Sequence, residues 1–183
     1  METLYVRDRN QWRAWLEKNH DKAPEVWLVK YNKASGKPCV SYNDAVEEAL
    51  CFGWIDSTVR KNDKESTIQR FSPRNPKSNW SELNKERVRR LIANKQMTPA
   101  GLKLLEEVDL EVHPIKLSDE IRSALQKDPE IWENFEKFDD LYKRIRIAYI
   151  EEAKKQKRFE EFDRRLNSFI RATKKNRKIG TIL

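Results

Sequence analysis

The segment from Cys51 to Gly101 contains the residues whose types and spacing are best suited to recognising a ligand. Residues 70–95 hold eight Lys or Arg and two Glu, a local surplus of +6. Such a concentration of charge favours an anionic partner. Arginine binds carboxylate or phosphate through paired hydrogen bonds, and tryptophan offers an aromatic wall. The chemistry indicated is therefore the binding of a small anion.

We expect these groups to form one small pocket. The helix expected over residues 80–94 begins with backbone N–H groups that have no partner within the helix, and its dipole also favours an anion there. The alternatives are a proline-containing connection with solvated arginines and a structural role for Asn84, whose buried amide would need hydrogen-bond partners. The residues assigned to the pocket are Trp54, Asp56, Arg70, Arg74, Ser78, Asn79, Trp80, Asn84 and Arg87.

Catalysis has weak support, and we assign no catalytic residue. Asp56 beside a cationic cluster is most often an ion-pair partner, and neighbouring arginines oppose the raised pKa that a general base needs. Cys51 has no histidine near it in sequence to activate it. An enzyme that acts on an anionic small molecule through Asp56 or Cys51 is the alternative. His20 and His113 are isolated, so we predict no metal and no cofactor.

The C-terminal tail is the second basic feature. Residues 170–183 contain five Lys or Arg and no acid. Together with the basic residues around Phe71 and Trp80, this tail would suit a sequence-neutral contact with nucleic acid or another acidic surface, and the alternative is a solvated, frayed tail. No zinc-finger, RRM or KH signature accompanies the tail. Nucleic-acid or acidic-surface binding is therefore a further alternative, and the oligomeric state is left open.

The composition favours a folded protein of the cytoplasm. The chain has 183 residues, a net charge of +8 and 10% aromatic residues, and so many aromatic residues argue against disorder. We find no secretory segment and no apolar run that could cross a bilayer. The two cysteines, Cys39 and Cys51, lack metal or redox spacing and favour a reducing compartment.

The elements that position these groups are a small sheet and its helices. Alternating or β-branched runs predict strands at Thr3–Val6 and Val26–Tyr31, and an antiparallel hairpin from Trp54–Arg60 and Ser66–Ser72. Strand alternation puts Trp54, Asp56, Thr58 and Arg60 on one side. Helices are expected after the caps Asp8, Ser41, Ser78 and Thr98, and the spacing of Trp12 and Trp15 marks a core face.

Residues beyond Leu117 carry helical periodicity only. Successive helices are expected to begin at Ser118 or Asp119, at Asp128-Pro129, and at Asp139 or Asp140, and apolar residues continue at helical spacing to Ile170. We therefore predict an α+β fold. A small antiparallel sheet packed by helices would occupy residues 1–115, and an all-helical module with a basic tail would occupy residues 116–183.

Several runs resemble the YdeI/OmpD-associated family, also called bacteriocin-protection proteins. They are SYNDAVEEALCFGWID (Ser41 to Asp56), RFSPRNPKSNWSELNKERVRRLI (Arg70 to Ile92), MTPAG (Met97 to Gly101), and, in the helical part, ALQKDPEIWENFEKF and YIEEAKK (Tyr149 to Lys155). The family's Asp-Gly-Arg-Trp motif has no counterpart in Leu102 to His113. The resemblance implies an α+β cytosolic protein linked to tolerance of antimicrobial peptides or to envelope stress, and it names no biochemical activity.

Overall fold

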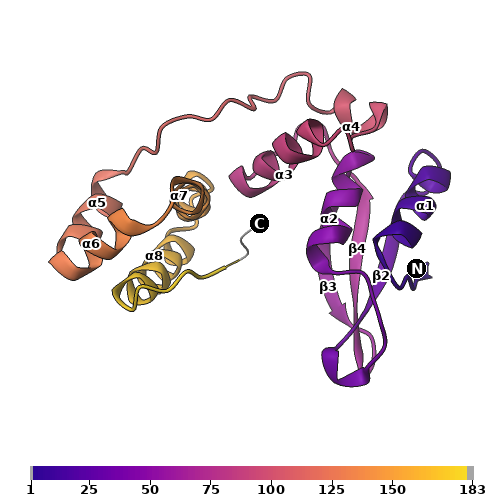
Figure 1. Ribbon diagram of the computed structural model, residues 1–183, viewed down its shortest axis with the longest axis horizontal. Helices are drawn as coiled ribbons and strands as arrows, with labels where there is room; N and C mark the ends of the chain where they lie inside the picture. Colours follow the sequence, from indigo (N-terminus) through magenta and orange to yellow (C-terminus); the bar gives the residue numbers. More distant parts are fainter. Residues whose placement is uncertain (1, 181–183) are drawn as a thin grey trace. The chain divides into compact units, whose positions relative to one another are not determined.

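The computed structural model describes residues 2–180, with strands and helices in the first half and helices alone in the second (Figure 1). The strands are β1 (Thr3–Leu4), β2 (Val26–Tyr31), β3 (Trp54–Lys61) and β4 (Ser66–Pro73). The helices are α1 (Arg9–Asn19), α2 (Tyr42–Cys51), α3 (Glu82–Ala93), α4 (Pro99–Lys103), α5 (Asp119–Gln126), α6 (Pro129–Lys137), α7 (Asp140–Lys155) and α8 (Phe159–Lys174), with a 3-10 turn η1 (Lys33–Ser35). The α+β class is confirmed.

The four strands form one sheet in the order β1-β2-β4-β3. β4 pairs antiparallel with both β2 and β3, so the expected hairpin is formed. The short strand β1 runs parallel to β2, and α1 provides the crossover that a parallel pair requires. The sheet is therefore mixed, whereas we expected a wholly antiparallel one.

Helices α1 and α2 cover one face of the sheet with an aromatic core. The Trp12 ring stacks on Trp15 with centroids 5.3 Å apart, and it lies at the same distance from Phe71 of β4. Trp12 is fully buried and donates through Nε1 to the Ala45 carbonyl of α2. The prediction that Trp12 marks a core face is confirmed. A smaller apolar cluster of Trp27, Val29 and Ile68 lies on the other face.

A bulge in β3 changes which of its side chains share a face. The register shifts between Asp56 and Val59, where three steps along β3 oppose two along β4. Asp56 stays on the face covered by α2, whereas Arg60 lies on the opposite face, 4.8 Å from the centre of the Trp27 ring. The prediction that Arg60 shares a side with Trp54 and Asp56 is wrong, because a bulge inserts one extra residue.

The start of α3 also differs from the prediction. Ser81, not Ser78, accepts the hydrogen bond at the start of this helix. The backbone N–H of Asn84 donates to Ser81 Oγ at 3.2 Å. Ser78 instead donates its hydroxyl to the Asn75 carbonyl at 2.7 Å. The Ser78 hydroxyl that would have capped the helix is therefore hydrogen-bonded to the turn at residues 75–76, and the helix begins at Glu82.

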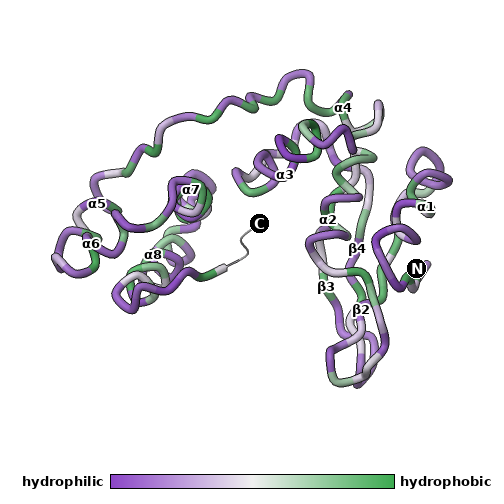
Figure 2. The backbone as a smooth tube through the Cα atoms, viewed as in Figure 1, coloured by the Kyte–Doolittle hydropathy of each residue, from purple (hydrophilic) through white to green (hydrophobic). Residues whose placement is uncertain are grey.

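Helices α5 to α8 form the C-terminal module around their own apolar core. Figure 2 shows hydrophobic and hydrophilic residues following one another within single turns of these helices, the pattern of amphipathic helices. The core residues are Ile121, Leu125, Ile131, Phe135, Phe138, Tyr142, Ile147, Ile150, Ala153, Phe162, Leu166 and Phe169. Across residues 2–180, none of the helices has the length and apolar character needed to cross a bilayer.

The chain divides into two compact units. The first comprises Met1–Asn79 and Glu86–Leu110, and the second comprises Trp80–Lys85 and Glu111–Leu183. The division after residue 110 lies five residues before the boundary that we expected. Residues 80–85, at the beginning of α3, group with the C-terminal helices, which the sequence did not indicate.

Candidate functional site

A polar cluster lies in the first unit where α2 begins over the sheet. We call it the Tyr42 cluster, and it consists of Lys30, Tyr42, Asn43, Asp56, Gln69 and Arg87. Lys30, Asp56 and Gln69 project from the covered face of β2, β3 and β4, and Arg87 comes from α3. Five elements thus contribute to one cluster.

Asp56 is the carboxylate of the Tyr42 cluster. The Tyr42 hydroxyl donates to its Oδ2 at 3.2 Å, and Gln69 Nε2 donates to the same atom at 2.7 Å. Burial raises the pKa of Tyr42 to about 12, and the nearby charge of Asp56 acts in the same direction. Tyr42 is therefore a hydrogen-bond donor at neutral pH, and it is not a base.

Two cations lie against the Tyr42 ring. Lys30 Nζ is 4.9 Å from the ring centre, and Arg87 Cζ is 5.9 Å from it. Arg87 donates through Nη2 to Asn43 Oδ1 at 2.9 Å. Burial lowers the pKa of both Lys30 and Arg87, because each charged group has lost part of its hydration. The Tyr42 cluster thus contains two partly desolvated cations near the Asp56 carboxylate.

Two of the nine predicted pocket residues, Asp56 and Arg87, belong to the Tyr42 cluster. Its other four members were missed by sequence reasoning. Strand alternation could have predicted Lys30 and Gln69. Lys30 lies two residues from buried Leu28, and Gln69 lies two residues from buried Phe71, so both point to the covered face of the sheet. A polar residue at such a position needs partners.

Arg70 and Trp54 have other roles in the fold. Arg70 lies on the face of the sheet opposite Asp56, where its Nε pairs with Glu25 Oε2 at 2.6 Å. Trp54 is 1% exposed and donates to the His20 carbonyl at 2.9 Å. Its ring meets Trp15 edge to face, with centroids 5.7 Å apart. The structure therefore brings neither side chain to the Tyr42 cluster.

Arg74, Ser78 and Asn79 gather on the connection that follows β4. Arg74 is buried, and its Nη2 donates to the Asn79 carbonyl at 2.5 Å and to the Ser78 carbonyl at 3.4 Å. Arg74 thus holds the backbone of this connection in place. The side chain of Asn79 is exposed.

Trp80 and Asn84 are half-buried and belong to the second compact unit. The backbone N–H of Asn84 is the group that Ser81 caps. Their membership of one pocket with residues of the first unit stays a prediction.

Cys51, the alternative nucleophile, is fully buried at the end of α2. Burial raises the pKa of its thiol to about 11. Since the thiolate is the nucleophilic form, the thiol is inert at neutral pH. This environment is that of a packed core residue.

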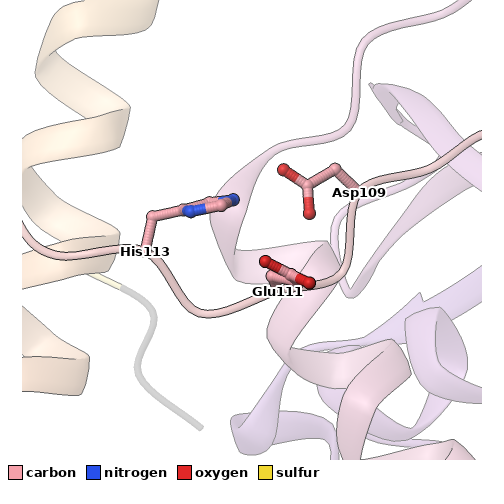
Figure 3. Close-up of side chains that lie close together, drawn as sticks. All are labelled: Asp109, Glu111 and His113. Carbon is pink, nitrogen blue, oxygen red and sulfur yellow. The ribbon is translucent and has the colours of Figure 1, made fainter.

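A second group of polar side chains lies on the segment between α4 and α5. Asp109, Glu111 and His113 are exposed, and their ligand atoms lie within 4.8 Å of one another. Figure 3 shows the three side chains close together. The chain curves between Asp109 and His113, so that these two side chains approach each other beside Glu111. Two carboxylates and an imidazole are donors that many divalent metals accept. The prediction of no metal rested on counting histidines alone and did not consider the D-x-E-x-H spacing.

Comparison with known proteins places both parts of the chain. Residues 4–104 match the model of a domain of unknown function, DUF8412, and residues 114–176 match the model described as bacteriocin-protection, YdeI or OmpD-associated. The runs Ser41 to Asp56 and Arg70 to Ile92, on which the resemblance was partly based, fall within the first match. No curated protein and no solved structure matches the chain. The model that covers more than half of the chain is that of DUF8412, and the C-terminal module is similar to the YdeI/OmpD-associated family; the chain therefore belongs to the DUF8412 domain family.

Proposed function

We propose that this protein binds a small anionic ligand at the Tyr42 cluster without transforming it. The observation that supports the proposal is the pair of desolvated cations, Lys30 and Arg87, against one ring and near one carboxylate. A bound anion would offset the lost hydration of both cations. Tyr42 is 37% exposed, so one edge of the site is open to solvent.

Binding without chemistry is favoured by the protonation states of the candidate reactive groups. Tyr42, with a pKa of about 12, and Cys51, with a pKa of about 11, both keep their protons at neutral pH. Asp56 receives two neutral hydrogen-bond donors, which hold its carboxylate in place. These are the features of a recognition site.

We propose a cytoplasmic location and a role in tolerance of antimicrobial peptides or in envelope stress. The location rests on the two free cysteines, Cys39 and Cys51, which suit a reducing compartment. The role rests on the name of the family to which the C-terminal module is similar. An anionic metabolite that signals such stress would be the expected ligand.

The test is isothermal titration calorimetry of the full chain with acetate, citrate and phosphate at constant ionic strength. At least one anion is expected to bind saturably. Lys30→Met should weaken that binding at least tenfold, because a hydrogen bond to a charged group contributes about 1.5–3 kcal/mol.

The matched control is Lys33→Met, which removes the same charge from an exposed residue of η1. It should leave the affinity within about twofold, as expected for a screened surface charge. The proposal fails if none of the three anions binds, or if the two variants weaken binding equally.

A further inference from the structure

The C-terminal module contains a cavity of about 370 Å³ between α7, α8 and the segment after α8. Its polar lining is dominated by guanidinium groups from two helices. The residues that matter here are Arg146 and Tyr149 of α7 and Arg164, Arg165, Ser168 and Arg171 of α8. All of them lie within the second compact unit and within the match to the YdeI/OmpD-associated family.

The lining carries an excess of positive charge. Among the described residues that line the cavity, Glu161 is the single acid. Arg165 Nε pairs with Glu161 Oε1 at 2.8 Å, and Arg164 pairs with Oε2. These pairings hold the pKa of Glu161 below its usual value, so it stays charged at neutral pH. Four arginines against one glutamate leave a surplus of +3. Arg171 makes no hydrogen bond or ion pair with any residue of the described chain.

Arg146 is fixed at the inner wall of the cavity. It is 9% exposed, and its guanidinium carbon lies 5.1 Å from the centre of the Tyr149 ring. Arg165 lies against the same ring at 3.7 Å. The backbone of Gly180 packs so closely that a Cβ there would lie 1.9 Å from Arg146 Nη1. Burial lowers the pKa of Arg146, so this cation too lacks part of its hydration.

We propose that this cavity is a second anion site, separate from the Tyr42 cluster, and that it binds a small soluble phosphomonoester. Guanidinium groups that approach from two helices suit a tetrahedral dianion with three acceptor oxygens, whereas one arginine already satisfies a planar carboxylate. Arg146, Arg171 and the Ser168 hydroxyl supply the donors. A volume of 370 Å³ exceeds that of phosphate alone and leaves space for a small organic group beside Tyr149.

The experiment titrates inorganic phosphate and glycerol 3-phosphate into the full chain by calorimetry at constant ionic strength. The chain carries Lys30→Met, which weakens the site proposed in the first unit at least tenfold. Saturable binding is expected, with glycerol 3-phosphate tighter than phosphate. Arg171→Ala should weaken both at least tenfold, and because Arg171 is exposed this variant is expected to fold.

The matched control is Arg122→Ala, which removes one exposed arginine from α5, away from the cavity lining. It should change the affinity less than twofold. Arg146→Lys keeps the charge and loses the bidentate geometry, and it should weaken binding severalfold. Absence of saturable binding in the parent chain, or equal losses in Arg171→Ala and Arg122→Ala, overturns the proposal. Either result leaves the proposal for the Tyr42 cluster untouched, since the parent chain already lacks Lys30.

Discussion

Lys30 lies on the covered face of β2, in phase with the buried residues Val26 and Leu28. Its ammonium group therefore lies against the Tyr42 ring, whereas the ammonium group of a surface lysine would be hydrated. The burial that would favour the proposed anion at Lys30 also makes the charge of Lys30 unfavourable in the ligand-free protein. Stability and binding are thus opposed at this residue.

Lys30→Met is expected to raise the melting temperature at pH 7 in the absence of ligand. Burial sets the folded-state pKa of Lys30 below the unfolded value of 10.5, so the folded state is penalised below the folded pKa. The penalty disappears as the pH rises to 10.5, and the difference between variant and parent should shrink over that range. Each kcal/mol recovered corresponds to about 4–8 °C in the transition of a unit of this size. Calorimetric scans at pH 7 and pH 10.5 test this, with Lys33→Met as the control. A lower melting temperature for Lys30→Met would contradict it.

Cys51 should be unreactive in the native protein. A rise in thiol pKa from 9.0 to about 11 lowers the thiolate fraction at neutral pH about a hundredfold, and burial adds a steric barrier. In a Cys39→Ser chain, labelling by a disulfide reagent should therefore be at least a hundredfold slower before unfolding than after it. The labelling rate is measured from the change in absorbance of the reagent. Rapid labelling of Cys51 in the folded protein would contradict this prediction and would favour Cys51 as a nucleophile.

Gly101 should tolerate no side chain. A Cβ on it would lie 2.3 Å from the Cys51 carbonyl oxygen, which also accepts the Thr98 hydroxyl at 2.6 Å. Backbone atoms do not yield, so Gly101→Ala should destabilise the protein by about 3 kcal/mol. Gly36→Ala is the control, because Gly36 has φ +68° and nothing within 4 Å, and should lose only about 1 kcal/mol. Denaturant titration compares the two, and equal losses would refute the steric argument.

At the scale of elements, α1 and α2 are joined by ion pairs around a buried carboxylate. Glu48 is 1% exposed, and its two oxygens receive Arg9 Nε at 2.5 Å and Arg13 Nη1 at 2.8 Å. Both arginines come from α1, one turn apart, so Glu48 sets the position of α1 on α2. Removing the charge would leave Arg13 without its buried partner, whereas Arg9 would keep Glu47 and Asp44.

Glu48→Gln is therefore expected to destabilise the first unit by about 3 kcal/mol, the lower end of the range for breaking a buried pair. Glu17→Gln is the matched control, because Glu17 also pairs with Arg13, at 3.4 Å, but is exposed. It should cost less than about 0.5 kcal/mol. Urea titrations followed by tryptophan fluorescence measure both. Similar losses in the two variants would show that burial of Glu48 is unimportant.

Elements with strong local signals were predictable, and positions decided by distant partners were not. The caps at Asp8, Ser41 and Thr98 each form, because the signal and the group that it satisfies are three residues apart. Ser78 and Ser81 offer equal cap signals, and the turn at Asn75 decides between them. The bulge in β3 contains no glycine or proline from which it could have been predicted. The Tyr42 cluster is drawn from five elements, so only the fold brings it together.

At the scale of the whole molecule, the basic surplus that the sequence predicts is partly neutralised within each unit. Lys174 pairs with Asp128 at 2.9 Å, and Lys178 pairs with Asp139, so two of the tail's five cations bind the caps of α6 and α7. Counting charge along the chain located the basic segments correctly. It did not separate cations that hold the fold together from cations that are available to a ligand, because that depends on which acids lie opposite them.

The two units should unfold as two cooperative transitions, because each has its own core. The core of the C-terminal module draws only on residues 115–170, and the aromatic core of the first unit is centred on Trp12 and Phe71. Phe169, at 1% exposure, fills the module between α6 and α7. Phe169→Ala should remove about 3–5 kcal/mol from the second unit and lower its transition by more than about 10 °C. Differential scanning calorimetry should show the other transition unchanged.

Glu48→Gln supplies the reciprocal control, since it should lower only the transition of the first unit. If either variant lowers both transitions together, the units fold as one, and a ligand at the arginine-lined cavity would then also stabilise the Tyr42 cluster.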